Sequence, residues 1–512
     1  MKVGLIVSEK TNSKYALEFI EALRASATME VLLVKKEDSG DSASAGFIFR
    51  KLANIVVRMD ERYLNSTSYR GHLNEVELRE LEAVAPYATD SVDYLISLMG
   101  ESVPEHILGI SRHGALLVNA AIPSPKTTFA GFWEVYGKKA VTPFAIQLQT
   151  KASVQTVFTG RLLTQSSFLL NQAYVSRKAL SYLHKFLNKK QTHPEFNWSH
   201  LQSAVESELH SSYPSVFGLA GYITKRVFRT LQQKVAALQK KDQHWNVAFL
   251  RGDWQPLNLA KGLVFEHRND QFFADPFVIH KDGRDICFVE EYDYKTNLGH
   301  ITAFELKDQH AINLGAVIKE TFHMSFPYLF EYEGNLYMCP ETSGSREIRI
   351  YKCLEFPLKW EFEKALMKNI AAVDSLLLSE NGKWWMLTNI DSLQKNDNCT
   401  ELHAFYSDSP LSETWIPHPM NPLVIDPLKA RNGGLLRDGN KVYRVSQSQE
   451  FGVYGASSRI HEILEMTESN YTEKTIANIK ADFFKDIYGT HHLHSNGSVT
   501  VFDYCKDIKV NQ

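Results

Sequence analysis

Five turn motifs recur through the second half of the chain, and they constrain its fold more than any other feature. Each places a Gly beside Asp or Asn, between two short strands rich in apolar and aromatic residues, which is the pattern of a β-hairpin. The motifs lie at 281–283, 333–335, 380–382, 437–439 and 495–497. Hairpins repeated every roughly 50 residues are typical of a propeller with one hairpin at the centre of each blade. We therefore expect a five-bladed β-propeller over residues 244–512.

The residues that begin each blade predict where a ligand binds, because these positions converge at one end of a propeller's central channel. Blade one begins with Phe273-Ala-Asp-Pro-Phe277, and its next strand ends in Glu290 and Glu291, of which only one can face the channel. The predicted catalytic residues are Asp275, Glu341 and Asp374. The predicted substrate-binding residues are Glu290, Glu291, His323, Arg431, Arg444, Gln447, His491 and His492.

The residue types in this group favour sugar chemistry. Several carboxylates in one funnel raise the pKa of at least one of them, which suits a general acid beside a base. Arg431, Arg444 and His491 supply cations for the phosphate or diphosphate of an activated sugar. The alternative is that Asp275 is a turn residue in a structural ion pair with Arg431. We expect no metal site.

Several ordered strings of this region resemble a known family. They include 273–277, 289–292, 323–328, 340–342, 430–434 and 489–491. Together they are similar to the propeller domain at the N-terminus of plant glucosamine inositolphosphorylceramide transferases, which also occurs in bacterial proteins. The wider superfamily includes five-bladed glycoside hydrolases, and this resemblance implies that Asp275 is the base or nucleophile. The hydrolases carry an Asp on blade two where this chain has Ser325 to Pro327, which favours transfer over hydrolysis.

The first part of the chain predicts a different domain. Short apolar runs at 3–8, 29–34, 92–99 and 114–119 alternate with helical segments, as in an open, Rossmann-like α/β sheet over residues 1–175. The strings 117–119, 130–136 and 142–147 resemble the formyltransferase domain that uses formyl-tetrahydrofolate. That family needs an Asn, a His and an Asp. Here Asn119 is present, but Ala121 takes the place of the His and 135–194 contains no acid. We expect this site to be degenerate and not to use formyl-tetrahydrofolate.

Residues 176–243 predict a helical linker between the two domains. Its segment 216–241 is basic, contains no acidic residue and carries an apolar stripe at helical spacing. The stripe consists of Ile223, Val227, Leu231, Val235 and Leu238. Two interpretations are open: the stripe packs on a domain, or the helix makes peripheral contact with an anionic membrane surface.

The bulk composition narrows the function further. A net charge of -3 gives no signature of nucleic-acid binding, and the five Cys residues lack metal-ligand spacing and predict free thiols in a reducing compartment. No signal-peptide pattern or membrane-spanning run is present. We expect a cytoplasmic protein without a cofactor, and a place at the inner face of the membrane stays open.

The predicted function is a glycosyltransferase in cell-surface polysaccharide or glycolipid synthesis, with an activated sugar donor and a glycan or glycolipid acceptor as partners. Two alternatives stay open: a sugar N-formyltransferase that uses the propeller to bind sugar, and a non-catalytic glycan-binding protein. The oligomeric state is open as well.

Overall fold

The chain folds into two compact units, Met1–Gln239 and Lys240–Gln512. The second begins a few residues before the predicted propeller start at 244. The computed structural model describes residues 1–7, 14–26, 29–35, 47–64, 91–98, 100–120, 129–193, 213–236, 241–254, 258–268, 270–394, 397–450 and 453–509.

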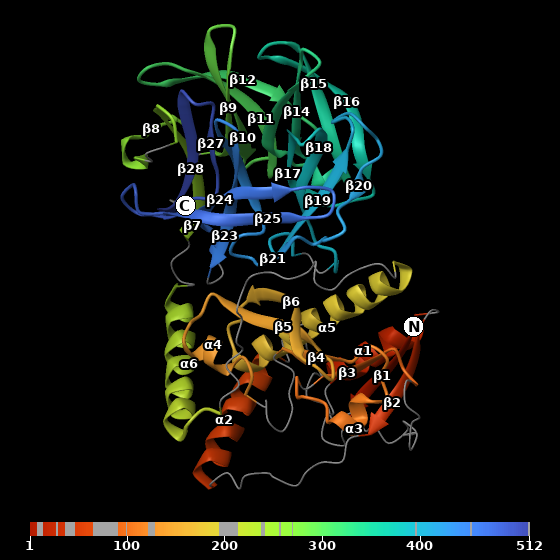
Figure 1. The fold of residues 1–512 in the computed structure, drawn as a ribbon. Coiled ribbons are helices and arrows are strands. Elements are labelled where there is room, and N and C mark those ends of the chain that lie inside the picture. The colour runs from red at the N-terminus through yellow and green to blue at the C-terminus, as the bar shows by residue number, and fades with distance from the viewer. Residues whose placement is uncertain are drawn as a thin grey trace. The chain divides into compact units, whose positions relative to one another are not determined.

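The first unit is built on a six-stranded mixed sheet (Figure 1). In sheet order its strands are β2 (Glu30–Lys35), β1 (Lys2–Val7), β3 (Tyr94–Ser97), β4 (Ala115–Asn119), β5 (Val141–Gln149) and β6 (Val154–Leu163). The first four are parallel and the last two antiparallel. The central strands β3 and β4 are almost wholly apolar and buried, as expected for a parallel sheet covered on both faces.

Among the described residues of this unit, six helices accompany the sheet. They are α1 (Lys14–Ala25), α2 (Phe47–Leu64), α3 (Glu105–Leu108), α4 (Phe132–Tyr136), α5 (Phe168–Thr192) and α6 (Val216–Ala236). Helix α5 begins before the predicted start of the helical linker at 176. Ser167 caps it, accepting a hydrogen bond from the Leu170 N–H at 3.4 Å. Helix α2 was not predicted from the sequence. The part of the predicted linker at 194–212 lies outside the described residues.

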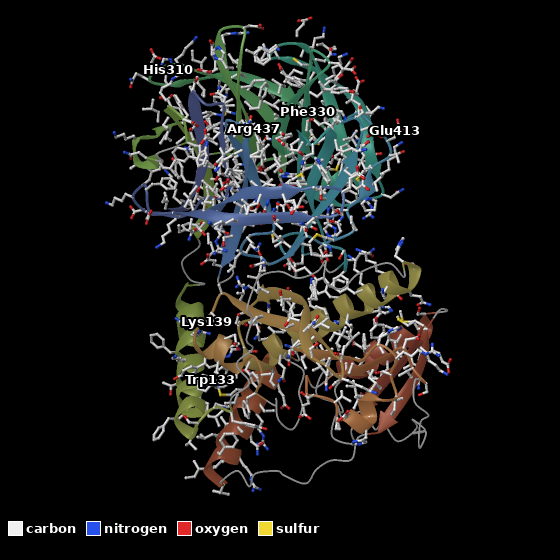
Figure 2. All side chains as sticks on the ribbon, viewed as in Figure 1. Trp133, Lys139, His310, Phe330, Glu413 and Arg437 are labelled. Atoms are coloured by element: carbon white, nitrogen blue, oxygen red, sulfur yellow. The ribbon has the colours of Figure 1, made fainter. Side chains whose placement is uncertain are left out.

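Helix α6 packs on its own unit through a stripe different from the expected one. Leu219 and Tyr222 are buried, and the Tyr222 hydroxyl donates to Asp60 of α2 at 2.8 Å. The Arg226 guanidinium lies 3.5 Å from the same carboxylate. Of the predicted stripe, Val227 is exposed and Ile223 half-buried, and Leu231, Val235 and Leu238 lack described side chains. Figure 2 shows Trp133 beside this helix, where it packs against Gly218.

Asn119 ends β4 and has a partner on the neighbouring strand. Its Nδ2 donates to Gln147 Oε1 on β5 at 2.7 Å. Ala121, which marks the degenerate formyltransferase site, lies outside the described residues. The formyltransferase interpretation of residues 1–175 therefore stays a prediction.

The second unit consists of five sheets, one for each predicted blade (Figure 1). Blade one is β9 (Gln271–Lys281), β10 (Arg284–Asp293), β11 (Leu298–Leu306) and β12 (Ala311–Ile318). Blade two is β13 (Ser325–Tyr332), β14 (Asn335–Glu341), β15 (Glu347–Glu355) and β16 (Lys359–Lys368). Blade three is β17 (Ala372–Glu380), β18 (Lys383–Ile390), β19 (Glu401–Ser407) and β20 (Ile416–Pro417), with β21 (Val424–Ile425) beside β19. Blade four is β22 (Asn432–Asp438), β23 (Lys441–Glu450), β24 (Val453–Met466) and β25 (Tyr471–Lys480).

Blade five joins the two ends of the unit and closes the ring. It combines β26 (Ile487–Gly489), β27 (Leu493–Ser495) and β28 (Val499–Lys509) with β7 (Lys241–Arg251) and β8 (Leu263–Val264). Strand β7 pairs with β28 over its whole length. The inner strands β9, β13, β17, β22 and β27 contact one another in cyclic order. The five-bladed propeller is therefore confirmed, and the glycine of each predicted turn adopts positive φ.

Apolar side chains fill the space between the blades. Figure 2 shows Phe330 among the strands, where it is buried, while His310 and Glu413 lie at the periphery and are exposed. This packing fixes the inner strands, whose first residues carry most of the candidate site.

Candidate functional site

The inner strands of the first three blades share one irregularity near their beginnings. In each, two residues of the inner strand lie opposite one residue of the next, a β-bulge. The first bulged residue is Asp275, Phe326 or Asp374, and each has a φ of about 50°. This left-handed backbone is rare outside glycine, and bulges of this kind re-aim a side chain. On blade two, Phe326 thus holds the position that is equivalent to Asp275 and Asp374.

A second repeated position lies on the neighbouring strand. Glu290, Glu341 and Asn389 pair with the residue just before each bulge. Glu290 and Glu341 are both buried. The next residue, Glu291, lies on the opposite face of the strand from Glu290. Its Oε2 accepts a hydrogen bond from Thr302 Oγ1 at 2.6 Å. This resolves the choice between Glu290 and Glu291 in favour of Glu290.

Asp503 on β28 organises the fifth blade around Asp275. Its Oδ1 accepts the backbone N–H groups of His491 and His492 at 2.9 and 3.0 Å. Its Oδ2 lies 2.5 Å from His491 Nδ1 and accepts the Asp275 N–H at 3.3 Å. The His491 ring stacks on Trp245 of β7, with ring centroids 4.0 Å apart. The carboxylate thereby holds the His491 imidazole and the backbone at Asp275, His491 and His492 in one arrangement.

Asp275 is buried between the two imidazoles. Its Oδ1 lies 3.6 Å from His491 Nε2 and 3.6 Å from His492 Nδ1. Burial raises the pKa of Asp275, but the imidazoles of His492 and His491 and the Arg431 guanidinium outweigh it, so the pKa is lowered. Burial lowers the pKa of His491, but the carboxylates of Asp503, Asp275 and Asp374 raise it overall. Asp275 is thus kept as a carboxylate.

The pKa of Glu290 is shifted in the opposite direction from that of Asp275. Its pKa is raised well above the ordinary value, first by burial and then by the negative charges of Asp275, Glu341, Asp374 and Asp503. His323 Nε2 lies 3.4 Å from Glu290 Oε1, and His323 Nδ1 accepts the Gly299 N–H at 2.9 Å. Because Nδ1 is an acceptor, the neutral ring carries its proton on Nε2, facing Glu290. The raised pKa favours the protonated form of Glu290, whose Oε1 faces the His323 Nε2–H as an acceptor.

Arg431 joins blades three and four and neutralises part of this acidic cluster. Its Nε donates to Asp374 Oδ2 at 2.6 Å, and its Nη2 lies 3.7 Å from Glu341 Oε2. Its guanidinium lies over the Tyr454 ring, 5.1 Å from the centroid, and its Nη1 donates to Cys399 Sγ at 3.5 Å. Its charged donors are already engaged by protein groups.

Asp374 receives two donors on the same oxygen, since Gln447 Nε2 also donates to Oδ2, at 2.9 Å. Burial raises the pKa of Asp374 to about 7, helped by Glu341 and Asp275 and opposed by Arg431. Gln447, a predicted substrate-binding residue, thus lies in the cluster.

Arg444 does not join this cluster. Its side chain is fully buried, and its Nε and Nη2 donate to the two carboxylate oxygens of Glu473 at 2.9 and 2.8 Å. Its Nη1 donates to the Ala430 carbonyl oxygen and to Asn432 Oδ1. We therefore leave Arg444 out of the proposed site, since a buried bidentate pair offers nothing to a ligand.

Three members of the site were not predicted from the sequence. They are Trp245 and Asp503 of blade five and Tyr454 of blade four. Tyr454 and Asp503 lie far along the chain from Asp275. A single Asp inside the apolar strand 499–505 was the available signal for Asp503, because buried carboxylates need partners.

One group of side chains could accept a metal. Within the part of the chain that the structure describes, the ligand atoms of Asp275, His491 and Asp503 lie within 4.8 Å of one another. The hydrogen-bond distance between Asp503 and His491 and the approach of His491 to Asp275 account for this proximity without an ion.

Comparison with known proteins supports the predicted resemblance of the propeller. Residues 260–492 match the family described as glucosamine inositolphosphorylceramide transferase 1, N-terminal. The protein named glucosamine inositolphosphorylceramide transferase 1 from Oryza sativa subsp. japonica is 34% identical over 207 residues, which are 40% of this chain and 27% of that protein. The protein of the same name from Arabidopsis thaliana is 34% identical over 208 residues, with the same shares. The match thus spans about a quarter of each curated relative.

Solved structures also align with this chain. Zg3597, a family 117 glycoside hydrolase of Zobellia galactanivorans, aligns with 52% of this chain and 93% of its own, at 12% identity and a TM-score of 0.35. The catalytic domain of Coprinopsis cinerea GH62 alpha-L-arabinofuranosidase aligns with 47% of this chain and 92% of its own, at 11% identity and a TM-score of 0.36. The family match lies wholly within the second unit, so the propeller of this chain is similar to the N-terminal region of these transferases.

Proposed function

We propose that this chain is a glycosyltransferase of glycolipid or cell-surface polysaccharide synthesis and that its reaction takes place at the inner ends of the propeller strands. The observation that carries the proposal concerns two buried carboxyl groups whose pKa values are shifted in opposite directions. The pKa of Asp275 is lowered and that of Glu290 is raised. Such a pair divides the roles of base and acid at one site. The names of the curated relatives point to the same class of reaction.

The proposed reaction exchanges one bond at the anomeric carbon for another. Glu290 gives its proton to the oxygen of the leaving group, and the bond from that oxygen to the anomeric carbon breaks. The acceptor hydroxyl forms the new bond and loses its proton to Asp275, whose charge also stabilises an oxocarbenium-like centre. Glu341 and Asp374, which the sequence predicts as catalytic, both contact Arg431, and in this proposal they act through it.

Arg431 and Arg444 give little support to the binding of a phosphate group beside the Asp275 carboxylate. Arg431 is engaged by Asp374 and Glu341, and Arg444 is sequestered by Glu473. Carboxylates outnumber cations around Asp275, which suits the hydroxyl groups of a sugar ring. A donor phosphate would have to displace one of the carboxylates that hold Arg431.

The test compares Asp275→Asn and Glu290→Gln with the wild type on a panel of sugar nucleotides and phosphosugars, each with glycan and glycolipid acceptors. We expect both variants to lose transfer by roughly 10²–10⁴-fold. Glu291→Gln is the matched control, because Glu291 is adjacent but bonded to Thr302, and it should retain activity. Turnover of either site variant at the wild-type rate would refute the assignment. Donor consumption without an acceptor product would identify a hydrolase.

A second candidate is a glycan-binding module without catalysis. It is favoured by the short match, which covers 27% of each relative and belongs to the region described as N-terminal. In that case the propeller binds glycan acceptors with no turnover, and Glu290→Gln leaves binding unchanged. Titration calorimetry with the same acceptors separates this candidate from the first. Folate-dependent formylation of an amino sugar would instead support the N-formyltransferase alternative.

A further inference from the structure

Helices α2 and α6 of the first unit each have a buried face and an outward face of unusual composition. The two helices pack against each other (Figure 1). Their inward faces contribute Val56, Leu219 and Tyr222 to one apolar cluster. Asp60 and Arg226 pair beneath this cluster. The inward packing of both helices is thereby complete, and it does not involve the outward side chains.

The outward faces expose large apolar side chains. Among the described residues, seventeen large hydrophobic side chains are exposed, and seven of them lie on these two helices. They are Phe47, Ile48 and Ile55 on α2, and Val216, Phe217, Val227 and Phe228 on α6. Phe217 is 86% exposed and Phe47 80%, the two highest values in the set. Such a concentration of exposed apolar surface marks an interaction site.

Basic residues are interleaved with these apolar ones. On α2 the exposed residues Ile48, Lys51, Ile55 and Arg58 follow one another at intervals of three and four, which places them on one side of the helix. On α6, Lys225 and Arg229 lie near Val227 and Phe228 in sequence. Apolar anchors flanked by Lys and Arg are the composition of helices that lie in a membrane interface.

The charge of the two helices decides what kind of surface they fit. In sequence, α2 contains Arg50, Lys51, Arg58 and Arg62 with Asp60 and Glu61, and α6 contains Lys225, Arg226, Arg229 and Lys234 with no acid. Eight bases minus two acids give +6, in a chain whose net charge is -3. The rest of the chain therefore carries -9. An anionic lipid surface attracts each nearby Lys or Arg and repels the acidic remainder, so it also orients the molecule.

We propose that the outward face of α2 and α6 docks peripherally on an anionic lipid surface, with Phe217 and Phe228 inserted among the headgroups and the basic residues beside the lipid phosphates. No described helix is long and apolar enough to cross a membrane. This docking does not depend on the reaction proposed for the propeller and can be measured without turnover.

The test is co-sedimentation of the purified full chain with vesicles. One set contains phosphatidylcholine alone, and the other contains phosphatidylcholine mixed with phosphatidylglycerol. The wild type should pellet with the anionic vesicles, and raising the salt concentration should release it. Phe217→Ser/Phe228→Ser and Lys51→Glu/Arg58→Glu should each weaken binding about tenfold or more. Leu464→Ser is the matched control and should bind normally, because Leu464 of the propeller is 58% exposed and Phe228 is 59%.

Circular dichroism of each variant confirms that it is folded. The proposal is overturned if the wild type binds neither vesicle, if it binds both equally, or if either double variant binds as well as the control. A concentration-dependent dimer in sedimentation equilibrium that Phe217→Ser/Phe228→Ser abolishes would also overturn it, because a second copy would then cover the face.

Discussion

Arg431, which directly precedes the inner strand of blade four, donates its Nε to Asp374 Oδ2 of blade three at 2.6 Å, and this pair ties two neighbouring blades together at the site. The Arg431 side chain is 16% exposed and the Asp374 side chain 1%. Because both groups are removed from water, each depends on the other for its charge balance.

Replacing Arg431 with Met should destabilise the protein by about 3–5 kcal/mol, since Asp374 and Glu341 are left buried without their cation. Arg437→Met is the matched control. Arg437 pairs with Glu380 at 3.1 Å, but its side chain is 49% exposed, so the loss should stay below about 1 kcal/mol. The free energy of unfolding from urea denaturation measures both. Equal losses of unfolding free energy in the two variants would show that the buried pair at the site stabilises the fold no more than the exposed pair does.

Asp374 should make stability depend on pH in a direction unusual for an acid. Its pKa is raised from 3.8 to about 7, so between these values the folded state keeps a proton that the unfolded chain has lost. Its contribution is present below pH 3.8 and is lost as the pH rises through 7. The free energy of unfolding of the wild type, relative to Asp374→Asn, should therefore fall between about pH 4 and pH 7. A difference that rises over this range would mean that Asp374 is ionised throughout.

The five blades could be predicted from the sequence because their hairpin turns depend on residues that are close together in the chain. Each hairpin turn needs a backbone that glycine adopts readily, and Gly283, Gly334, Gly382, Gly439 and Gly497 all have positive φ. Asp275 could be found for a similar reason, because its Ala-Asp-Pro string marks the first bulge. The closing strand β7 could not be found, since its pairing with β28 joins residues some 250 positions apart.

The roles of the arginines and acids could not be assigned from the sequence alone. Arg431 and Arg444 look equivalent there, and only the strand register places Glu473 against Arg444 and two carboxylates against Arg431. The choice between Glu290 and Glu291 likewise depends on which of them pairs with Ala274. Long-range register is set by packing across the whole propeller, and a local pattern does not encode it.

Phe326 holds the blade-two position that is equivalent to Asp275 and Asp374, and it should resist conversion to an acid. Its ring is fully buried, 5.3 Å from the His492 ring and 5.0 Å from the Phe277 ring. Phe326→Asp removes this packing and adds an unpaired carboxylate, so we expect a loss of at least about 3–5 kcal/mol. Phe326→Leu keeps an apolar side chain and should lose less than Phe326→Asp. If thermal unfolding finds the two variants equally stable, the site has room for another acid.

The alkaline limb of the pH–activity profile should belong to Glu290 if it is the general acid. Activity requires its protonated form, so kcat/KM falls as the pH rises through its elevated pKa. The negative charge of Glu341 is one cause of that elevation. Glu341→Gln should therefore lower the pKa of Glu290 and move the alkaline limb to lower pH. Glu291→Gln removes an acid that contacts Thr302 and His300, and it should leave the limb in place. An alkaline limb that does not move in Glu341→Gln would assign the proton donor to another group.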